Sequence, residues 1–270
     1  MMSNEFEFDL EGILRDAAQQ TGGNMFSPQK ESQTTIRIPP PLKGNPVVVN
    51  VKTHWMGDIM EGQVLNTHPQ SPSMCPVFKV CKAFERIAAQ APTPQVKEEF
   101  APYPGRGWAS KLRLNDRYWW NVIPEGAGRV MYMWTRRGFY TDLFDPDTGE
   151  IAVLQRQAKA KGRTFNPFHP EHGHDIILSY YPSKGKDAWG AKIVGEQSPI
   201  TVPGWERQLH NLQEVATSRV LALSDDELIE RLSERFDEVL RTLNIQGMRS
   251  VGEICGGGSA VSAPAGSAAG

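Results

Sequence analysis

The sequence predicts an α+β protein in which a small Greek-key β-barrel is followed by two helices. Two patterns lead to this fold class. Several short segments rich in β-branched and aromatic residues are separated by turns of Gly, Pro and Asp, which is typical of barrel strands. After residue 205, apolar residues recur at the three- and four-residue spacing of a helix. The chain has 270 residues, of which 39% are apolar, so it can bury one large core or two smaller ones.

The barrel is expected to span residues 34–200 and to carry an inserted helix-and-loop lobe at about 56–109. Within this lobe, Pro76 begins a helix that runs to about Gln90, because Pro is favoured in a first turn and apolar residues follow at helical spacing. A loop rich in Pro and Gly follows at 91–109. The strands are predicted at residues 34–38, 46–55, 110–123, 129–135, 150–155, 175–181 and 189–195.

The two ends of the chain flank this barrel. Residues 1–33 read as an acidic arm with a short helix at 9–20. Residues 201–252 are expected to form a pair of helices packed on the barrel, the second opened by a capping box that starts at Ser224. Residues 253–270 are dominated by Gly, Ala and Ser and cannot bury enough surface to fold.

Charge is segregated along the chain, although its total is only −2. Residues 36–195 carry 21 Lys and Arg against 14 Asp and Glu, whereas residues 1–35 and 196–270 carry net charges of −4 and −5. A basic body between acidic ends favours a polyanionic partner. No apolar run is long enough for a membrane helix, the first residues lack a secretory signal, and three Cys provide no disulfide framework. We therefore expect a cytoplasmic protein without a membrane partner.

The predicted strand at 110–123 separates two chemistries by alternation. One parity carries cations, Asn and a single Trp: Lys111, Arg113, Asn115, Arg117, Trp119 and Asn121. The other parity is largely apolar: Leu112, Leu114, Tyr118, Trp120 and Val122. Because successive strand residues point to opposite faces, one face enters a core and the other offers cations beside an aromatic ring. Such a face is typical of proteins that bind single-stranded nucleic acid. A bulge at Asn115-Asp116 would instead turn Tyr118 and Trp120 outward.

The order of segments resembles the single-stranded DNA-binding proteins of T-even-type bacteriophages. The matching segments are TIRIPP, VVNVKTHW, THPQSPSMCPVFKVC, RYWWNVI, RVMYMW and NPFHPEHGHDIIL, and the resemblance covers roughly residues 30–255. It implies an oligonucleotide-binding (OB-type) barrel that coats single-stranded DNA without sequence preference in replication, recombination and repair. It also implies a protein that is not an enzyme, acts in the cytoplasm of the infected host cell, and meets replication and recombination proteins as well as further copies of itself on DNA.

Three departures from that family alter the expectations. Acidic residues 5–11 stand where the family has a basic arm, which puts cooperative binding through the arm in doubt. The family also ends in an acidic tail that recruits replication partners, whereas no charged residue follows Glu253 in this sequence. The family also holds zinc through one His and three Cys. Here His54 and Cys75 match by position, but Phe78 replaces the next Cys. Cys81 shares an apolar helix face, and His68 is the remaining substitute ligand. We expect neither zinc nor another cofactor.

The candidate DNA-binding residues are cations and aromatics of the predicted strands and of the loop after the strand at 175–181. They are Arg37, Lys52, Lys111, Arg113, Arg117, Tyr118, Trp119, Arg129, Tyr132, Trp134, Tyr180, Tyr181, Lys184, Lys186, Trp189 and Lys192. Two alternatives remain open. One is a metal-dependent hydrolase that uses His169, His172 and His174. The other is a zinc-dependent interaction module built around residues 54–81.

Overall fold

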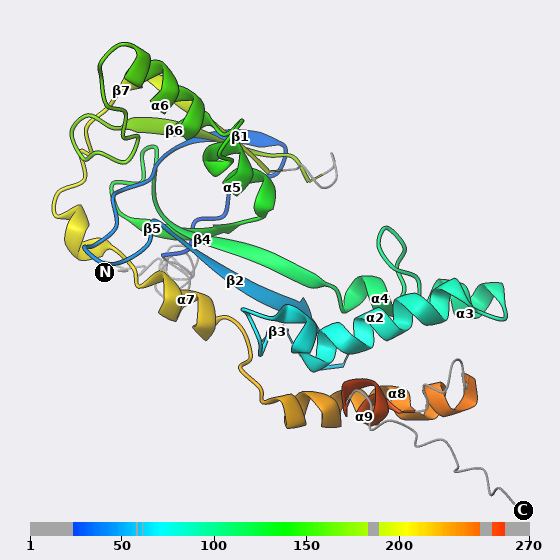
Figure 1. The fold of residues 1–270 in the computed structure, drawn as a ribbon. Helices are drawn as coiled ribbons and strands as arrows, with labels where there is room; N and C mark the ends of the chain where they lie inside the picture. Colours follow the sequence, from blue (N-terminus) through cyan, green and yellow to red (C-terminus); the bar gives the residue numbers. More distant parts are fainter. Residues whose placement is uncertain (1–23, 58, 61, 183–188, 244–249, 257–270) are drawn as a thin grey trace, which may run out of the picture. The chain divides into compact units, whose positions relative to one another are not determined.

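The computed structural model describes residues 24–57, 59–60, 62–182, 189–243 and 250–256 (Figure 1). The chain divides into two compact units. Unit 1 comprises Met1–Asn50 and Arg117–Val215, and unit 2 comprises Val51–Asp116 and Ala216–Gly270. The helix predicted at 9–20 lies outside the described residues. None of the helices in the described ranges combines the length and the apolar composition that crossing a bilayer requires.

Seven strands form one sheet, in the order β3-β2-β4-β1-β6-β7, with β5 paired to β4 off this path. Their bounds are β1 Ser32–Arg37, β2 Val48–Trp55, β3 Gln63–Leu65, β4 Leu114–Pro124, β5 Met131–Thr135, β6 His174–Tyr180 and β7 Trp189–Gln197. The pairings of β1 with β4 and β6, of β2 with β3, of β4 with β5 and of β6 with β7 are antiparallel. Because β3 and β7 end the path, the sheet is open. The α+β class is confirmed, and the boundary between the units falls within β2 and β4.

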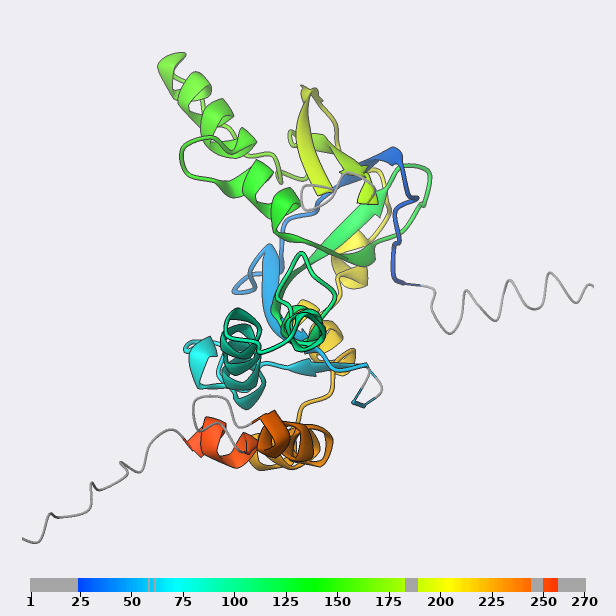
Figure 2. The same ribbon diagram turned by 90° about the vertical axis from the view of Figure 1, so that its right-hand side faces the viewer.

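The core of unit 1 lies between its strands and two helices, α5 (Arg137–Phe144) and α6 (Glu150–Ala160). Tyr118, Trp120 and Val122 of β4 enter this core, as their parity predicts. Figure 2 shows α5 and α6 to one side of β6 and β7, and both helices contact β7. The apolar interior of unit 1 therefore receives side chains from β1, β4, β5, β6 and β7.

The strand predicted at 150–155 is wrong, because these residues begin α6. Gly149 caps the helix and Glu150 lies in its first turn, where a carboxylate is favourable. Ile151 is buried, and Leu154 packs against the same core three residues later, which is the spacing of a helix face. The good helix formers RQAKA extend the helix to Ala160.

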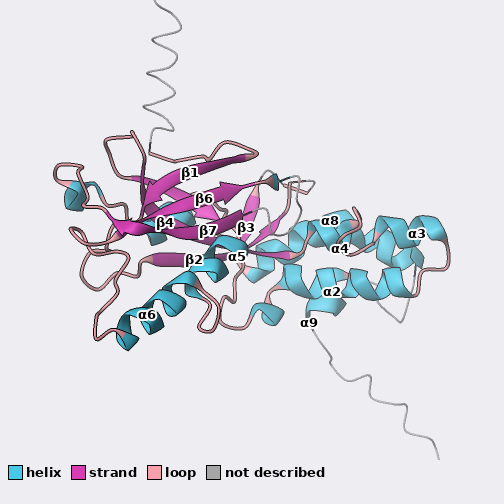
Figure 3. Ribbon diagram, turned by 90° about the horizontal axis from the view of Figure 1, so that it is seen from above, coloured by secondary structure: helices cyan, strands magenta, loops and turns pink. Residues whose placement is uncertain are grey.

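The core of unit 2 is helical. In α2 (Pro76–Ala89), the predicted face of Val77, Val80 and Phe84 is buried. The opposing helix is α8 (Asp225–Leu243), whose Phe236 makes a T-shaped contact with Phe84 at 4.8 Å between ring centroids. Figures 1 and 3 show α2 and α8 side by side. The sequence predicted that this C-terminal helix packs on the barrel. The apolar face of α8 instead packs against α2, the helix of the inserted lobe.

The capping box of α8 forms as predicted. The carboxylate of Glu227 accepts hydrogen bonds from the backbone N–H of Ser224 at 2.7 Å and from its hydroxyl at 2.8 Å. The Glu227 N–H donates back to Ser224 Oγ at 3.3 Å. Upstream of this cap, the first predicted helix is reduced to a 3₁₀ turn, η3 (Trp205–Gln208), and the short α7 (Leu212–Ser218).

Three local predictions need correction in unit 2. The loop at 91–109 contains α3 (Pro94–Glu99), which starts after Thr93, whose side chain accepts a hydrogen bond from the Val96 N–H. Residues 108–111 form α4 (Trp108–Lys111), so the strand predicted from residue 110 begins only at Leu114. Residues 253–256, predicted as the start of a disordered tail, close α9 (Val251–Gly256), with Cys255 buried. Residues 257–270 lie outside the described residues.

Candidate nucleic-acid interface

The best-formed candidate contact in unit 1 joins Arg117 of β4 to Trp134 of β5. Trp119 pairs directly with Trp134, so Arg117, two residues earlier, shares their face of the sheet. The Arg117 guanidinium carbon Cζ lies 4.1 Å from the centroid of the Trp134 ring, a cation–π distance. Both side chains are half-buried. The pair therefore combines a positive charge and an aromatic face at one place.

Arg117 keeps its charge without a carboxylate partner among the described residues. Burial, with a smaller contribution from Arg136, lowers the pKa of Arg117 to about 10, so the guanidinium stays protonated at neutral pH. Arg136 is exposed and follows β5 directly. Two neighbouring cations that repel each other are stabilised by an anion placed between them. The arrangement fits a phosphate group.

A chain of aromatic rings continues from Trp134. Trp134 and Trp189 lie 5.7 Å apart between ring centroids, and Trp189 and Tyr180 lie 4.3 Å apart. The β6–β7 register brings Tyr180 directly opposite Trp189. Trp189 is buried, whereas Trp134, Tyr180 and Tyr181 are half-buried. Thus the structure brings Arg117, Trp134 and Tyr180 together through a buried Trp189.

The lysines predicted near this chain are only partly placed. Lys192 is exposed on β7. Lys184 and Lys186 lie outside the described residues. Arg129, just before β5, is also exposed. Lys192 and Arg129 add positive charge to unit 1.

Trp119 does not stack as predicted, because it is only 2% exposed. Its face of β4 is covered by the segment around His210. Asn121 Nδ2 donates to the His210 carbonyl at 3.0 Å, and the His210 N–H donates to Asn121 Oδ1 at 2.9 Å. The His210 ring also meets the buried Tyr132 edge-on, with centroids 5.0 Å apart. Tyr118, on the other face, is buried against Tyr140. Within unit 1, the more exposed part of this face is its Arg117–Trp134 end, because Arg117 and Trp134 are half-buried whereas Trp119 and Asn121 are buried.

Sequence reasoning missed a second group of aromatic rings. Tyr118 stacks on Tyr140 at 4.5 Å, Tyr140 on Phe144 at 5.2 Å, and Phe144 on Phe168 at 6.0 Å, with interplanar angles of 16°, 17° and 18°. Tyr140, Phe144 and Phe168 are half-buried. Tyr140 and Phe144 lie four residues apart, a spacing that would have predicted α5 and a shared face. Because these rings stack on one another, they contribute chiefly to packing.

The remaining predicted cations are arranged differently. In unit 2, the Arg113 guanidinium carbon lies 4.3 Å from the centroid of the Tyr103 ring, and Lys111 Nζ lies 4.4 Å from that of Trp108. Lys52 is half-buried on β2. Since α4 replaces the start of the predicted strand, Lys111 does not follow its alternation. In unit 1, Arg37 is only 5% exposed and lines a pocket of about 500 Å³.

Of the two residues matched by position to a zinc site, Cys75 is buried and His54 makes other hydrogen bonds. His54 is fully buried, its Nδ1–H donates to the Leu112 carbonyl at 2.8 Å, and its Nε2 accepts from Asn66 Nδ2 at 3.0 Å. Burial lowers the pKa of His54 to about 4. Cys81 donates to the Ala109 carbonyl at 3.2 Å, and burial raises the pKa of its thiol to about 11. Phe78 packs against the core of unit 2, as predicted.

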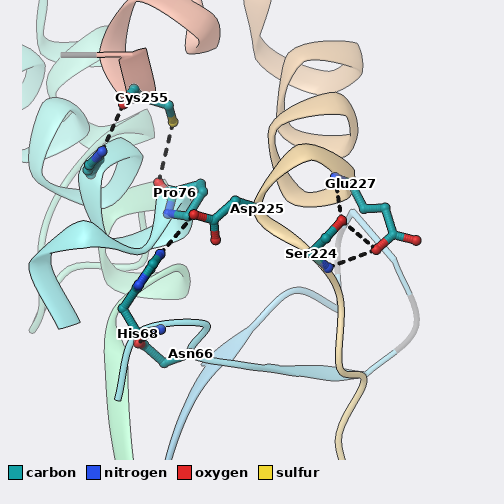
Figure 4. Close-up of polar contacts among 8 residues, drawn as sticks. Asn66, His68, Pro76, Ser224, Asp225, Glu227 and Cys255 are labelled. Carbon is teal, nitrogen blue, oxygen red and sulfur yellow. Dashed lines mark hydrogen bonds and ion pairs between the residues drawn. The ribbon is translucent and has the colours of Figure 1, made fainter. Parts of the chain in front are cut away.

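His68 pairs with Asp225 in unit 2. His68 Nε2 lies 2.8 Å from Asp225 Oδ2, as Figure 4 shows. The interaction joins the segment after β3 to the first turn of α8. In the same view, Cys255 Sγ lies 3.8 Å from the Pro76 carbonyl, which it meets as a weak donor. Across the described residues, no three His, Cys, Asp or Glu side chains converge as metal ligands.

The histidines of the hydrolase alternative also serve the fold. His169 Nδ1 accepts hydrogen bonds from the backbone N–H groups of Glu171 and His172. His174 is buried, with its Nδ1 at 2.9 Å from the Val194 carbonyl. The rings of His169 and His172 stack 5.0 Å apart. The rings of His169 and His174 thus help to shape the entry to β6, whereas His172 is exposed.

Neither a protein-family model nor a curated protein matches this chain.

Proposed function

We propose that the protein binds single-stranded DNA without marked sequence preference, through the Arg117–Trp134 end of the β4–β5 face. The observation that carries this proposal is the cation–π pair itself: a half-buried guanidinium without a carboxylate partner in the described residues, 4.1 Å from an aromatic ring. A phosphate neutralises the positive charge of Arg117 and Arg136. Any of the bases can stack on an aromatic surface, because each has a π-face. The role is one of coating and protecting DNA rather than of catalysis.

The topology of unit 1 supports an OB-type architecture. Its strands β1, β4, β5, β6 and β7 run in the order β5-β4-β1-β6-β7. This is the order of a five-stranded Greek-key barrel opened between its third and fifth strands. The helices α5 and α6 fall between the third and fourth strands. Proteins of that type bind oligonucleotides on the second and third strands, here β4 and β5, and on the loop between the fourth and fifth. Arg117, Trp134 and Tyr180 occupy or border these places.

The resemblance to T-even phage proteins extends the proposal to a biological setting. There the protein would serve DNA replication, recombination and repair in the cytoplasm of an infected host cell, in contact with replication and recombination proteins. Self-association along DNA belongs to the same proposal. The basic stretch of residues 36–195 supports the binding of DNA by unit 1, because most of this stretch, including β1 and β4 to β7, lies in that unit.

The test is a titration of the purified chain with a dT oligonucleotide at several salt concentrations. If about five phosphates are neutralised, log affinity falls with log salt at a slope near −3.5, at about −0.7 per phosphate. Oligonucleotides of dT and dA, in which bases differ but charge does not, are expected to bind with similar affinity. A slope near zero, or tighter binding to duplex than to single strands, refutes the proposal.

A further inference from the structure

Unit 1 contains a second polar site, whose lining residues include neither Arg117 nor Trp134. It is a pocket of about 500 Å³, within the range of about 300–1,000 Å³ that small-molecule sites occupy. Arg37 from β1 and Asp175 from β6 line it, together with Ser198 and the turn Glu125–Gly128 that follows β4. Gly126 and Gly128 of this turn have positive φ angles of 75° and 62°, a conformation that Gly adopts without strain.

Arg37 is the unusual residue of this pocket. Its side chain is only 5% exposed, yet only Nη2 is satisfied, by donating to the His169 carbonyl. Nε and Nη1, which carry three N–H groups, have no partner among the described residues. A buried cation with unmatched donors is strongly unfavourable, and a bound partner that accepts these hydrogen bonds would stabilise it.

The guanidinium is held in place by a close approach of the backbone. A Cβ atom added to Gly173 would meet Arg37 Nη2, the His169 carbonyl and the Pro167 carbonyl, all far inside van der Waals contact. Any other residue at position 173 would therefore displace the guanidinium. This close approach holds Nη2 against the His169 carbonyl and so fixes the position of the guanidinium.

The other polar groups define what kind of ligand fits. Ser198 Oγ is buried and, within the described residues, has no hydrogen-bond partner either. Asp175 interacts electrostatically with Arg37 and opposes the lowering of its pKa by burial, but the two form no ion pair. Asp175 and Glu125 would repel a phosphate. The pocket thus suits a ligand that presents acceptors to Arg37 and donors to Asp175.

We propose that this pocket binds a guanine base. Guanine O6 and N7 are adjacent acceptors, the pair that Arg most often recognises on a base. Guanine N1–H and the N2 amino group are donors that a carboxylate such as Asp175 accepts. Adenine carries an amino donor in place of O6, and thymine lacks a donor pair for the carboxylate. This inference goes beyond the proposed function, because a free guanine nucleotide and a guanine within a strand present the same groups.

The experiment measures binding of dGMP, dAMP, dCMP and dTMP to the full chain by calorimetry. The expected result is that dGMP binds about tenfold or more tightly than the other three, as one good base contact provides. A second series compares a dT oligonucleotide with the same oligonucleotide carrying one dG. A preference in both series places the base in the strand path and would restrict the proposed sequence tolerance to the other three bases. A preference for dGMP alone places the pocket off that path, and both results support a guanine site.

Two variants make the test specific. Arg37→Met removes the unpaired charge and keeps most of the side-chain volume, and Asp175→Asn keeps shape while replacing one acceptor by a donor. In each variant, the ratio of dGMP affinity to the affinity for the other nucleotides is expected to fall about tenfold. The circular-dichroism spectrum is expected to stay unchanged. The matched control is Arg163→Met, because Arg163 is an exposed cation of unit 1 outside the pocket.

Three outcomes overturn the inference. They are no detectable dGMP binding, equal or tighter binding of dCMP or of the other nucleotides, and a dGMP preference that survives in both folded variants. The first would mean that only water satisfies Arg37. If dT oligonucleotides bind in that case, the proposed function stands while the guanine pocket fails. If dGMP binds but no oligonucleotide does, the reverse holds.

Discussion

Asn121 and His210 exchange two hydrogen bonds across 89 residues of sequence, one in each direction between side-chain amide and backbone. This pair fastens the segment before α7 onto β4. Underneath it lie Trp119 and Tyr132, which are 2% and 7% exposed. The face that the strand pattern assigned to nucleic acid is therefore divided into a covered part and an accessible end at Arg117 and Trp134.

The first prediction concerns this fastening. Asn121→Ala leaves the His210 N–H and carbonyl without their partner, so the free energy of unfolding is expected to fall by about 1–3 kcal/mol. Acrylamide should then quench tryptophan fluorescence more strongly, because Trp119 becomes accessible. Urea denaturation measures the first effect. Gln155→Ala, an exposed change on α6, is the control. Wild-type stability in Asn121→Ala would show that the covering segment is held by other contacts.

The second prediction separates two tryptophans that face each other across β4 and β5. Trp134→Ala is expected to weaken binding of a dT oligonucleotide by about 1–3 kcal/mol and to leave the salt slope unchanged, because stacking releases no counterions. Trp119→Ala is expected to lower folding stability by about 3–5 kcal/mol, since it empties a buried site. Equal losses of affinity in the two variants, with stability retained, would contradict the division of the face.

The third prediction tests the charge of Arg117. Arg117→Ala should flatten the salt slope by about 0.7 and weaken binding to dT and dA oligonucleotides alike, because one phosphate contact is lost. Arg231→Ala is the matched control, since Arg231 is paired with Glu234 on α8 in unit 2. An unchanged slope in Arg117→Ala would remove this residue from the interface.

Local patterns in the sequence predicted much of the secondary structure. The alternation in β4 correctly assigned Tyr118, Trp120 and Val122 to the core, and the capping box at Ser224 correctly located the start of α8. These signals work because they depend on neighbours within one strand or one helical turn. The failure at 150–155 arose from the same kind of signal, because a run of four apolar residues fits a strand and a helix equally until the full length of the segment is considered.

The candidate site was harder to predict because exposure is a tertiary property. The pattern of β4 places Trp119 beside Arg117, and the register with β5 agrees with it. What it omits is the segment around His210, whose position depends on contacts remote in sequence. The pocket at Arg37 has the same origin, since Arg37, Asp175 and Ser198 come from three separate segments. Charge patterning selected Arg37 as a candidate but gave no sign that its donors are buried.

The fourth prediction concerns metal. Purified protein is expected to contain no stoichiometric zinc and to keep its circular-dichroism spectrum in chelator, because both ring nitrogens of His54 are already hydrogen-bonded. A structural zinc site, by contrast, couples metal loss to unfolding. Metal analysis by mass spectrometry provides the measurement. One tightly bound zinc per chain would refute the prediction.

The fifth prediction follows from the burial of His54. Its pKa is about 4 in the folded protein, against an ordinary value of 6.5, so the unfolded chain binds a proton in a range where the folded chain does not. This contribution to stability is full above pH 6.5 and is lost as the pH falls toward 4, with a slope of up to about 1.4 kcal/mol per pH unit. Urea titrations between pH 7.5 and 4 measure it, and the range is shared with His210, whose pKa is also lowered by burial.

His54→Gln isolates the contribution of His54, because a Gln side chain does not titrate in this range. The difference in unfolding free energy between wild type and variant should shrink as the pH decreases from 6.5 toward 4. Gln155→Ala, an exposed change on α6 that removes no titratable group, is the control and should show a nearly constant difference. If the wild-type and His54→Gln curves run parallel across this range, His54 is not held neutral by burial, and its assignment as a hydrogen-bonded core histidine fails.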